Sequence, residues 1–497
     1  MAAIITEKFR LNNAKQFVED MSEGASKAYM FVGRGHAWTD DSTPPTPVDN
    51  PNDEYDAYRN MIALKAITSS DISHAIVRRD WTSGTTYDEY RHNYSSSNTS
   101  SSSATSLWSS LYYVVTDDYN VYKCLSNGTA DGTAVNASTE KPSHTTVATP
   151  TESDQYQWKY MYSISASDVI KFVTNDFIPI KTLGAKEAVI GGVANAAGNQ
   201  DGGLGDAATD DGSAQWDVEN GAVNGALDKV RLISGGSNYD NATTTGIAIR
   251  GDGSGGVATV VTAGGAVTSV SITTAGTNYT TAHIANEDIP GFDNASQKAD
   301  GSNVSANIEF IIPPKDGHGA NPIAELGANY VILNSRLEYA EGTGDFPTDN
   351  DFRQIGVVIN PTIGTNSFSS DSTLKAYKQM TFVSGGFSAP SVDTIIRNAN
   401  PEEETTAVGV VVSVDSTNRK ISYLPYPNEA GGIVAFANGN TIVSGSGPTS
   451  HGTLASSSAI TAEEVNRFSG DIIYLENRSA VSRASDQIED IKLIVEM

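Results

Sequence analysis

Two groups of residues in this sequence have types and spacings that could carry chemistry, and the first is a glycine motif. Gly251, Gly253 and Gly256 satisfy the GxGxxG spacing of a dinucleotide-binding loop. Such a loop must lead directly into a helix, because the helix N-terminus binds the pyrophosphate. Residues 257–261 are instead typical of a strand. We therefore interpret the match as accidental.

The histidines and carboxylates form the second group. No two of the seven histidines have the spacing of a zinc motif, and His318 between two glycines is expected in a loop. Carboxylate runs such as 117–118 and 402–404 follow from an acidic composition, and the separation of about 5–10 Å that a glycosidase needs is not visible in a sequence. We predict no catalytic residue, no metal and no cofactor, and a polysaccharide-degrading enzyme is the least favoured function.

One basic cluster could bind a partner. Arg78 and Arg79 are followed by Asp80 and Trp81, and Arg and Trp are enriched at the hot spots of protein interfaces. An internal ion pair with stacking would explain the same residues, and both interpretations stay open. The full set of interface candidates is Arg78, Arg79, Trp81, Trp158, Arg353 and Arg478.

The charge balance limits the possible partners. The chain of 497 residues has 59 Asp plus Glu against 32 Lys plus Arg, a formal net charge of -27. Such a surface repels phosphates and anionic lipids, so we expect neither nucleic acid nor membrane as a partner. The single cysteine, Cys124, cannot form an intramolecular disulfide, and no apolar run approaches the ~18 residues of a membrane span. These features are typical of a protein made in a reducing cytoplasm.

The first part of the chain, up to about residue 183, is expected to mix helices and strands. Asn12 or Asn13 is predicted to cap a first helix, and Asp53 a second one that carries Tyr55, Tyr58, Ile62 and Ala66. Residues 112–115 and 121–124 are predicted to form a hairpin. The aromatic alternation over 156–164 favours a strand packed on a core over a sugar-binding platform. Residues 94–106 and 126–150, rich in Ser, Thr and Asn, are expected to be surface loops or disordered.

The segment 184–312 differs sharply in composition and contains an internal repeat. Residues 230–239 recur as 270–279, each copy being a short strand, a turn of small residues and a tyrosine. This pattern predicts two related β-units that pack their apolar faces together.

The last part of the chain is also predicted to be mainly strands. Asn321 and Pro322 open a short helix that Gly327 closes. Residues 408–414 and 421–423 have the alternation of two strands joined by a turn, typical of a small barrel or sandwich. Two further strands are predicted at 471–476 and 491–496.

These motifs, taken in order, resemble a known family. They look like the baseplate wedge subunit called gene product eight in T-even type contractile-tailed phages, and the arrangement from Gly317 to Gly327 is similar to longer members from cyanobacterial phages. The resemblance covers about 1–183, 315–361 and 462–497 and is carried by colinear motifs at 8–10, 31–34, 38, 78–81, 121–125, 156–160, 352–356, 360–361, 470–478 and 486–487.

The resemblance implies a structural protein of the virion tail baseplate and not an enzyme. It implies a homodimer that also contacts other wedge subunits, after assembly in the host cytoplasm. We expect a mainly β fold with a few short helices, built as a multi-subdomain sandwich or barrel framework. Its predicted parts are a discontinuous framework at 1–183, 313–365 and 460–497, a Gly-rich module at 184–312 and a small barrel-like module at 366–459. The alternative function is a carbohydrate-binding or receptor-binding tail protein that uses the Gly-rich insertion.

Overall fold

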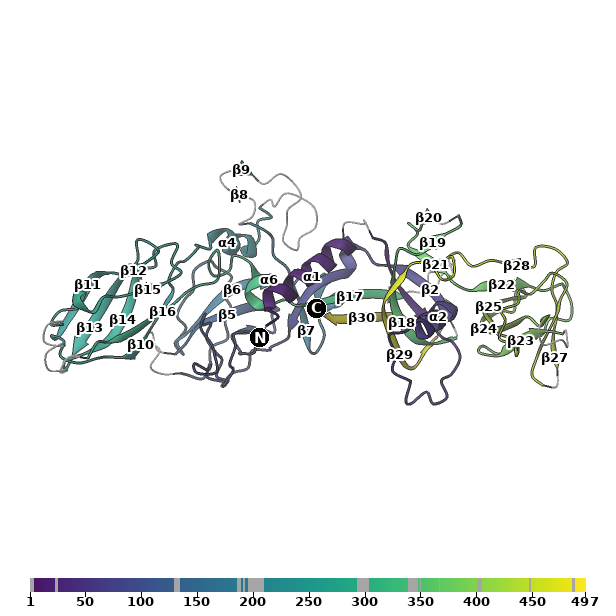
Figure 1. Cartoon of the computed structure of the whole chain (residues 1–497), viewed down its shortest axis with the longest axis horizontal. Helices are drawn as coiled ribbons and strands as arrows, with labels where there is room; N and C mark the ends of the chain where they lie inside the picture. The colour runs from purple at the N-terminus through teal and green to yellow at the C-terminus, as the bar shows by residue number, and fades with distance from the viewer. Residues whose placement is uncertain are drawn as a thin grey trace. The chain divides into compact units, whose positions relative to one another are not determined.

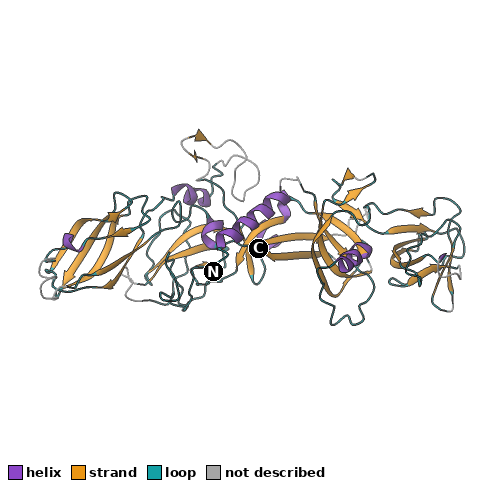
Figure 2. Cartoon of the chain, viewed as in Figure 1, coloured by secondary structure: helices purple, strands orange, loops and turns teal. Residues whose placement is uncertain are grey.

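The computed structural model forms two compact units, each discontinuous in sequence. Unit 1 comprises Met1–Glu19, Ser73–Ile332 and Ile494–Met497, and unit 2 comprises Asp20–Ile72 and Leu333–Leu493. Strands dominate both and helices are few (Figure 2), which confirms the mainly β class. The structure describes residues 4–22, 26–128, 135–185, 189–190, 193–194, 210–292, 304–337, 347–348, 350–365, 367–399, 405–446, 448–484 and 488–497.

An antiparallel sheet of three strands carries the aromatic core of unit 1 (Figure 1): β4 (Tyr113–Val115), β5 (Asn120–Asn127) and β6 (Tyr156–Ser163). The predicted hairpin is confirmed, since Val115 pairs with Val121. Tyr156, Trp158 and Tyr160 of β6 are buried in one apolar cluster. The core interpretation of the alternating aromatics is therefore confirmed, and these rings do not form an exposed sugar platform.

Helices α4 (Ala214–Gly221) and α6 (Pro322–Leu326) pack in the apolar clusters that contain β6. Val218 of α4 belongs to the same apolar cluster as Trp158. Ile323 and Leu326 of α6 join a second cluster with Val121 and Tyr162. The other elements are α1 (Glu7–Ser22), α3 (Ala166–Phe172) and a sheet of order β30-β17-β3-β7, with β3 (Ile72–Val77), β7 (Phe177–Ile180), β17 (Tyr330–Leu337) and β30 (Glu489–Glu496).

A buried ion pair links two distant parts of unit 1. Lys123 on β5 donates to a carboxylate oxygen of Glu325 on α6, and both side chains are almost fully buried. Glu325 also accepts the backbone N–H groups of Gly319 and Asn321 at 3.0 and 3.1 Å. The predicted caps of α6 are confirmed, because Asn321 accepts from the Ala324 N–H and Gly327 has a φ of 69°.

The Gly-rich segment forms a β-module with a core of its own. Its sheets are β10-β16, β11-β13-β14 and β12-β15. The strands are β10 (Lys229–Ser234), β11 (Ala242–Ala248), β12 (Arg250–Gly251), β13 (Val257–Ala263), β14 (Ala266–Thr274), β15 (Ala282–His283) and β16 (Asn307–Ile311), with a 3-10 turn η2 (Asn286–Asp288) and the short strands β8 (Val189–Ile190) and β9 (Val193–Ala194) before them. Because Gly256 is followed directly by β13, the GxGxxG match does not open a helix.

The internal repeat is also a structural repeat. Asn238 and Asn278 have φ angles of 65° and 60°, so both copies turn through the same left-handed conformation. The tyrosines that follow are buried in one cluster, where the Tyr239 hydroxyl accepts the Ala306 N–H at 2.8 Å. The Tyr279 hydroxyl accepts the Gly256 N–H at 3.1 Å. The two copies of the repeat, 230–239 and 270–279, therefore pack in one core as predicted.

Both predicted N-terminal helices have different limits in the structure. Helix α1 begins at Glu7, with the Thr6 hydroxyl accepting the Phe9 N–H, so Asn12 and Asn13 lie inside the helix and do not cap it. In unit 2, α2 (Pro51–Asn60) has Asn50 as its N-cap, and not Asp53. Residues Ile62 and Ala66 belong to β2, because strand pairing with β1 ends the helix at residue 60.

Unit 2 contains a five-stranded sheet of order β21-β2-β1-β18-β29. Phe31 on β1 lies opposite Gly356 on β18, and a Cβ atom at position 356 would lie 2.2 Å from the Phe31 ring. The motif at 31–34 therefore packs directly against the motif at 352–356, and the phenylalanine fits only because residue 356 is glycine. Its strands are β1 (Ala28–Gly33), β2 (Met61–Ala66), β18 (Asn350–Ile359), β21 (Thr373–Lys375) and β29 (Asp471–Arg483), and short elements nearby in sequence are η1 (Ser69–Asp71), β19 (Thr362–Ile363) and β20 (Ser367–Phe368).

The second sheet of unit 2 has seven strands in the order β27-β26-β23-β24-β25-β22-β28. Met380, Ile396, Val411, Ile421 and Ile442 from five of these strands meet in one core. The sheet is open as described, and not a closed barrel. Its strands are β22 (Lys378–Thr381), β23 (Ile395–Asn398), β24 (Val408–Asp415), β25 (Lys420–Tyr426), β26 (Thr441–Ser444), β27 (Thr449–Thr453) and β28 (Ile460–Thr461). The division into a framework with modules at 184–312 and 366–459 stays a prediction.

Candidate functional site

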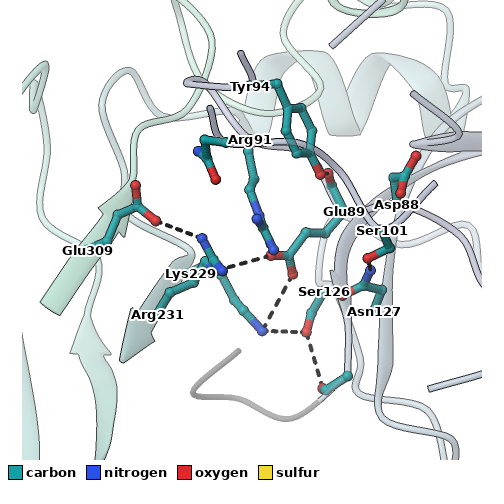
Figure 3. Close-up of polar contacts among 12 residues, drawn as sticks. Asp88, Glu89, Arg91, Tyr94, Ser101, Ser126, Asn127, Lys229, Arg231 and Glu309 are labelled. Atoms are coloured by element: carbon teal, nitrogen blue, oxygen red, sulfur yellow. Dashed lines mark hydrogen bonds and ion pairs between the residues drawn. The ribbon is translucent and has the colours of Figure 1, made fainter. Parts of the chain in front are cut away.

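Figure 3 shows a cluster of charged side chains where the Gly-rich module meets the rest of unit 1. We call it the junction cluster: Glu89, Arg91, Lys229, Arg231 and Glu309. Glu89 and Arg91 lie between β3 and β4, Lys229 and Arg231 on β10, and Glu309 on β16. Successive residues of a strand face opposite sides. Strand β10 therefore points its two cations to one side while Val230 enters the core of the module.

Glu89 is the centre of this cluster. Its carboxylate is 1% exposed and lies 2.8 Å from Nε of Arg91, 3.8 Å from Nε of Arg231 and 3.9 Å from Nζ of Lys229. A buried charge is tolerated only when it is paired. One carboxylate thus compensates cations that come from both sides of the junction.

A second carboxylate and neutral partners complete the cluster. Glu309 binds Nη1 of Arg231 at 2.9 Å and accepts from the amide of Asn93. Lys229 donates to the Ser126 hydroxyl at 2.6 Å. The module is therefore held by directional bonds to two stretches of the chain, 89–93 and 126, and these bonds define its orientation.

Asp88, next to Glu89, organises the serine-rich loop. Its carboxylate accepts the N–H and hydroxyl of Ser102 at 2.9 and 2.6 Å and the N–H of Leu111 at 2.8 Å. The loop over 94–106 therefore lies on the surface as expected, and is held in place by a buried carboxylate. Its composition alone contained no sign of this anchor.

Glu219 forms a second anchor at the start of the Gly-rich segment. It is buried on α4 and accepts the N–H groups of Leu183 and Ala185 at 2.9 and 3.3 Å, and the amide of Gln215 at 2.8 Å. Burial raises the pKa of Glu219 to about 7, although these hydrogen bonds oppose the shift. The carboxyl group of Glu219 therefore fixes the backbone of residues 183–185, which follow β7.

The loop around His318 meets the same region. Added Cβ atoms at Gly317 and Gly319 would lie 2.4 Å from the Val223 carbonyl oxygen and 2.7 Å from a Val218 methyl. His318 is buried with its ring 4.8 Å from that of Tyr90. Burial, together with Lys123 and Lys159, lowers the pKa of His318 well below its usual range. It is a neutral packing residue of a loop, as expected.

An open groove of about 780 Å³ lies beside the junction cluster. It is polar on the side of the framework and partly apolar on the side of the module. The residues that line it are His92, Asn93, Asn98, Arg231, Ile233, Thr280, Thr281, Ala282, Asn307, Ile308, Glu309, Phe310 and Ile312.

The basic cluster at 78–81 makes internal contacts. Arg78 binds Asp80 at 2.9 Å and the Thr174 carbonyl at 3.0 Å. Arg79 lies 4.4 Å above the Tyr113 ring and donates to the Ser110 carbonyl. Trp81 donates to the Ser138 hydroxyl at 3.1 Å. These contacts match the internal ion pair and stacking, and the interface role of the cluster stays a prediction.

The other three candidates occupy different environments. Trp158 is fully buried and stacks on Tyr156 at 5.4 Å. Arg353 on β18 is 4% exposed and binds Asp41 and Asp351 at 2.8 and 3.1 Å. Arg478 on β29 keeps 43% of its side chain exposed, 4.0 Å from Glu476. Of these three, Arg478 alone is placed on a surface.

The described part of the chain offers no arrangement of three His, Cys, Asp or Glu side chains that could hold a metal ion. Residues 402–404, 486 and 487, which the sequence analysis noted, lie outside the described residues. None of the helices within the described ranges is long and apolar enough to cross a lipid bilayer.

Removing the charge of Glu89 tests the junction cluster. We expect Glu89→Gln to lower the free energy of unfolding of unit 1 by about 3–5 kcal/mol, since it leaves buried cations without their shared carboxylate. Calorimetry and limited proteolysis of segment 184–312 measure the effect. The matched control is Glu140→Gln at an exposed position. If the two variants have equal free energies of unfolding, the junction cluster is not required for the stability of unit 1.

The raised pKa of Glu219 predicts a pH dependence. A carboxyl group whose pKa rises on folding stabilises the protein below its unfolded pKa and loses that contribution as the pH rises through its folded pKa. The stability of wild type relative to Glu219→Gln should fall by about 3 kcal/mol between roughly pH 4.5 and pH 7. Denaturant titrations at several pH values measure it, with Asp217→Asn, exposed on the same helix, as control. If the difference in free energy of unfolding between wild type and Glu219→Gln does not change with pH, the raised pKa of Glu219 is contradicted.

Comparison with known proteins adds an independent finding. Residues 3–148 match the model of the family Phage-Gp8, described as Bacteriophage T4, Gp8. Of the curated proteins compared, none matches the chain. The matched segment contains β1 to β5, Arg78, Arg79 and Trp81, and the framework half of the junction cluster. Over these residues the chain is similar to Phage-Gp8, a structural family of the phage tail baseplate, as its motifs indicated.

Proposed function

We propose that this chain acts by protein–protein binding as a wedge subunit in baseplate assembly. The observation that carries the proposal is the family match over residues 3–148, which includes the strands β1 to β5. We infer further that the subunit is a homodimer that contacts other wedge subunits, and that it works without catalysis. Assembly would take place in the host cytoplasm.

The surface of the described chain supports a binding role. Ile4, Ile5 and Phe9, at the start of the chain, have large exposed apolar side chains. Exposed apolar groups that gather on a surface are typical of interaction sites. Specific interfaces bury about 1,200–2,000 Å² in total, which requires more than one such group. Arg478 on the long strand β29 is the interface candidate with the most exposed side chain among the arginines.

Assembly and solution state test this proposal. We expect a dimer in sedimentation experiments at micromolar concentration, and the chain in purified virions by mass spectrometry. The variant Arg478→Glu should lower incorporation several-fold, while Lys420→Glu, exposed in the same unit, should not. A strictly monomeric protein that is absent from virions would refute the proposal.

The groove beside the junction cluster supports a second candidate, glycan binding by the Gly-rich module. Asn93, Asn98 and Asn307 offer amide groups, Thr280 and Thr281 offer hydroxyls, and Ile233 and Ile308 add apolar surface. Protein sites for saccharides also need polar groups that fix orientation within a concave surface. Among the lining residues His92 is exposed and Phe310 is buried, so the groove has no exposed Trp, Tyr or Phe ring as a stacking platform.

A glycan array decides between the two candidates. If the groove binds saccharides, Asn307→Ala combined with Thr281→Ala should abolish the signal, since both residues line it. The control is Thr268→Ala, exposed on β14 of the same module. If the wild-type protein binds no glycan, the glycan-binding candidate is rejected and the scaffold role is the one that is kept.

A further inference from the structure

An exposed aromatic pair in unit 2 is not explained by folding. Tyr55 on α2 is 51% exposed and Phe468 is 49% exposed, and their ring centroids lie 5.6 Å apart in an edge-to-face arrangement. Phe468 also contacts the ring of buried Tyr58 at 5.8 Å. We call Tyr55, Tyr58 and Phe468 the aromatic patch. Half of two large rings thus faces solvent at one place.

The backbone at Phe468 is unusual for such a residue. Its φ of 61° is left-handed, a conformation that bulky side chains rarely adopt and that Gly or Asn would adopt at lower cost. Residues that keep an unfavourable backbone conformation cluster at functional sites. Since half of the ring is exposed, core packing alone does not account for a phenylalanine at this position.

The loop that presents Phe468 is firmly held. The Ser469 hydroxyl donates to the Asn466 carbonyl at 2.6 Å and accepts the Thr362 N–H at 3.0 Å. The Asn466 N–H donates to the Thr362 carbonyl at 2.8 Å, and the Tyr58 hydroxyl donates to the Gly470 carbonyl. A preorganised side chain loses little conformational entropy on binding. The aromatic patch therefore has the rigidity of a binding anchor.

Acidic residues are neighbours of the aromatic patch in the sequence. Helix α2 contains Asp53, Glu54 and Asp56, and Asp471 follows the Phe468 loop. The Tyr58 hydroxyl lies 3.5 Å from a carboxylate oxygen of Glu54. Burial first, and then the charges of Glu54 and Asp471, raise the pKa of Tyr58 to about 12. The neighbouring arginines are compensated, Arg59 by Asp56 and Arg467 by Glu463. Because Asp56 is paired with Arg59, the net negative charge beside the patch comes from Asp53, Glu54 and Asp471.

We propose that the aromatic patch docks another baseplate protein, one that presents an apolar pocket rimmed by Lys and Arg side chains. Aromatic anchors in a complementary pocket are typical hot spots. A second copy of this chain fits less well, because a two-fold contact would bring the same acidic rim against itself. The inference rests on the proposed function and specifies one surface that performs it.

The test uses tail-assembly intermediates purified from cells infected with a phage that lacks this subunit. Binding of the full-length chain is measured by co-sedimentation. Phe468→Asn should bind at least about 30-fold more weakly, and Tyr55→Gln, which leaves the loop untouched, should also bind more weakly. The matched control Phe368→Asn, at an exposed phenylalanine of the same unit, should bind within about twofold of wild type. Wild-type binding should weaken as ionic strength rises from about 0.05 to about 0.5 M.

The outcomes separate the inference from the proposed function. If the wild-type chain does not bind the intermediates, the proposed function fails. If wild type binds and both Phe468→Asn and Tyr55→Gln bind equally well while keeping the wild-type circular dichroism spectrum, the inference alone is overturned. If the two variants lose self-association and still bind the intermediates, the occupant is a second copy, which also overturns the inference.

Discussion

The buried ion pair between Lys123 and Glu325 is the constraint on which unit 1 depends. It joins residues that are 202 positions apart, one before and one after the Gly-rich segment. Burial lowers the pKa of Lys123 and Glu325 opposes that shift, so neither charge is tolerated in the core without the other. The entropic cost of closing a long loop grows only slowly with its length. With Lys123 and Glu325 held together, a segment of this length between them adds little to the cost of closing the loop.

The Gly-rich module meets the rest of unit 1 through charged contacts as well as apolar burial. Its own core is complete, with Val230, Tyr239 and Phe310 in one cluster, so the module does not depend on its neighbour to bury them. At the junction, Lys229 and Arg231 meet Glu89 in the interior. Buried ion pairs contribute little net stability but tolerate few alternative geometries. The junction cluster therefore serves to specify one orientation of the module.

The sequence predicted the elements whose partners are local. The hairpin of β4 and β5, the aromatic strand β6 and the capped helix α6 follow from alternation and capping residues within a few positions. The end of α2 could not be predicted, because strand pairing of residues 61–66 overrides their helical spacing. The same holds for the site: Glu89 is one carboxylate among 59 Asp plus Glu residues, and its partners on β10 are about 140 positions away. Trp158 and Arg353 are predicted interface residues because Trp and Arg are common in protein interfaces. The same residue types also occur in buried internal networks, and sequence does not distinguish these two environments.

Burial also changes the meaning of the net charge. Lys123, Lys159, Lys229, Arg91, Arg353 and Arg483 are buried, more cations than carboxylates within the described interior. The exposed surface is therefore at least as acidic as the overall charge of -27 implies. Like charges keep free copies of a subunit apart, and a partner with the opposite charge lowers that barrier selectively. In such a chain apolar contact alone does not select a neighbour, because the acidic rim must be compensated as well. The proposed docking of the aromatic patch follows from this requirement, since a basic partner would compensate acidic residues such as Glu54 beside Tyr58 and a second copy would not.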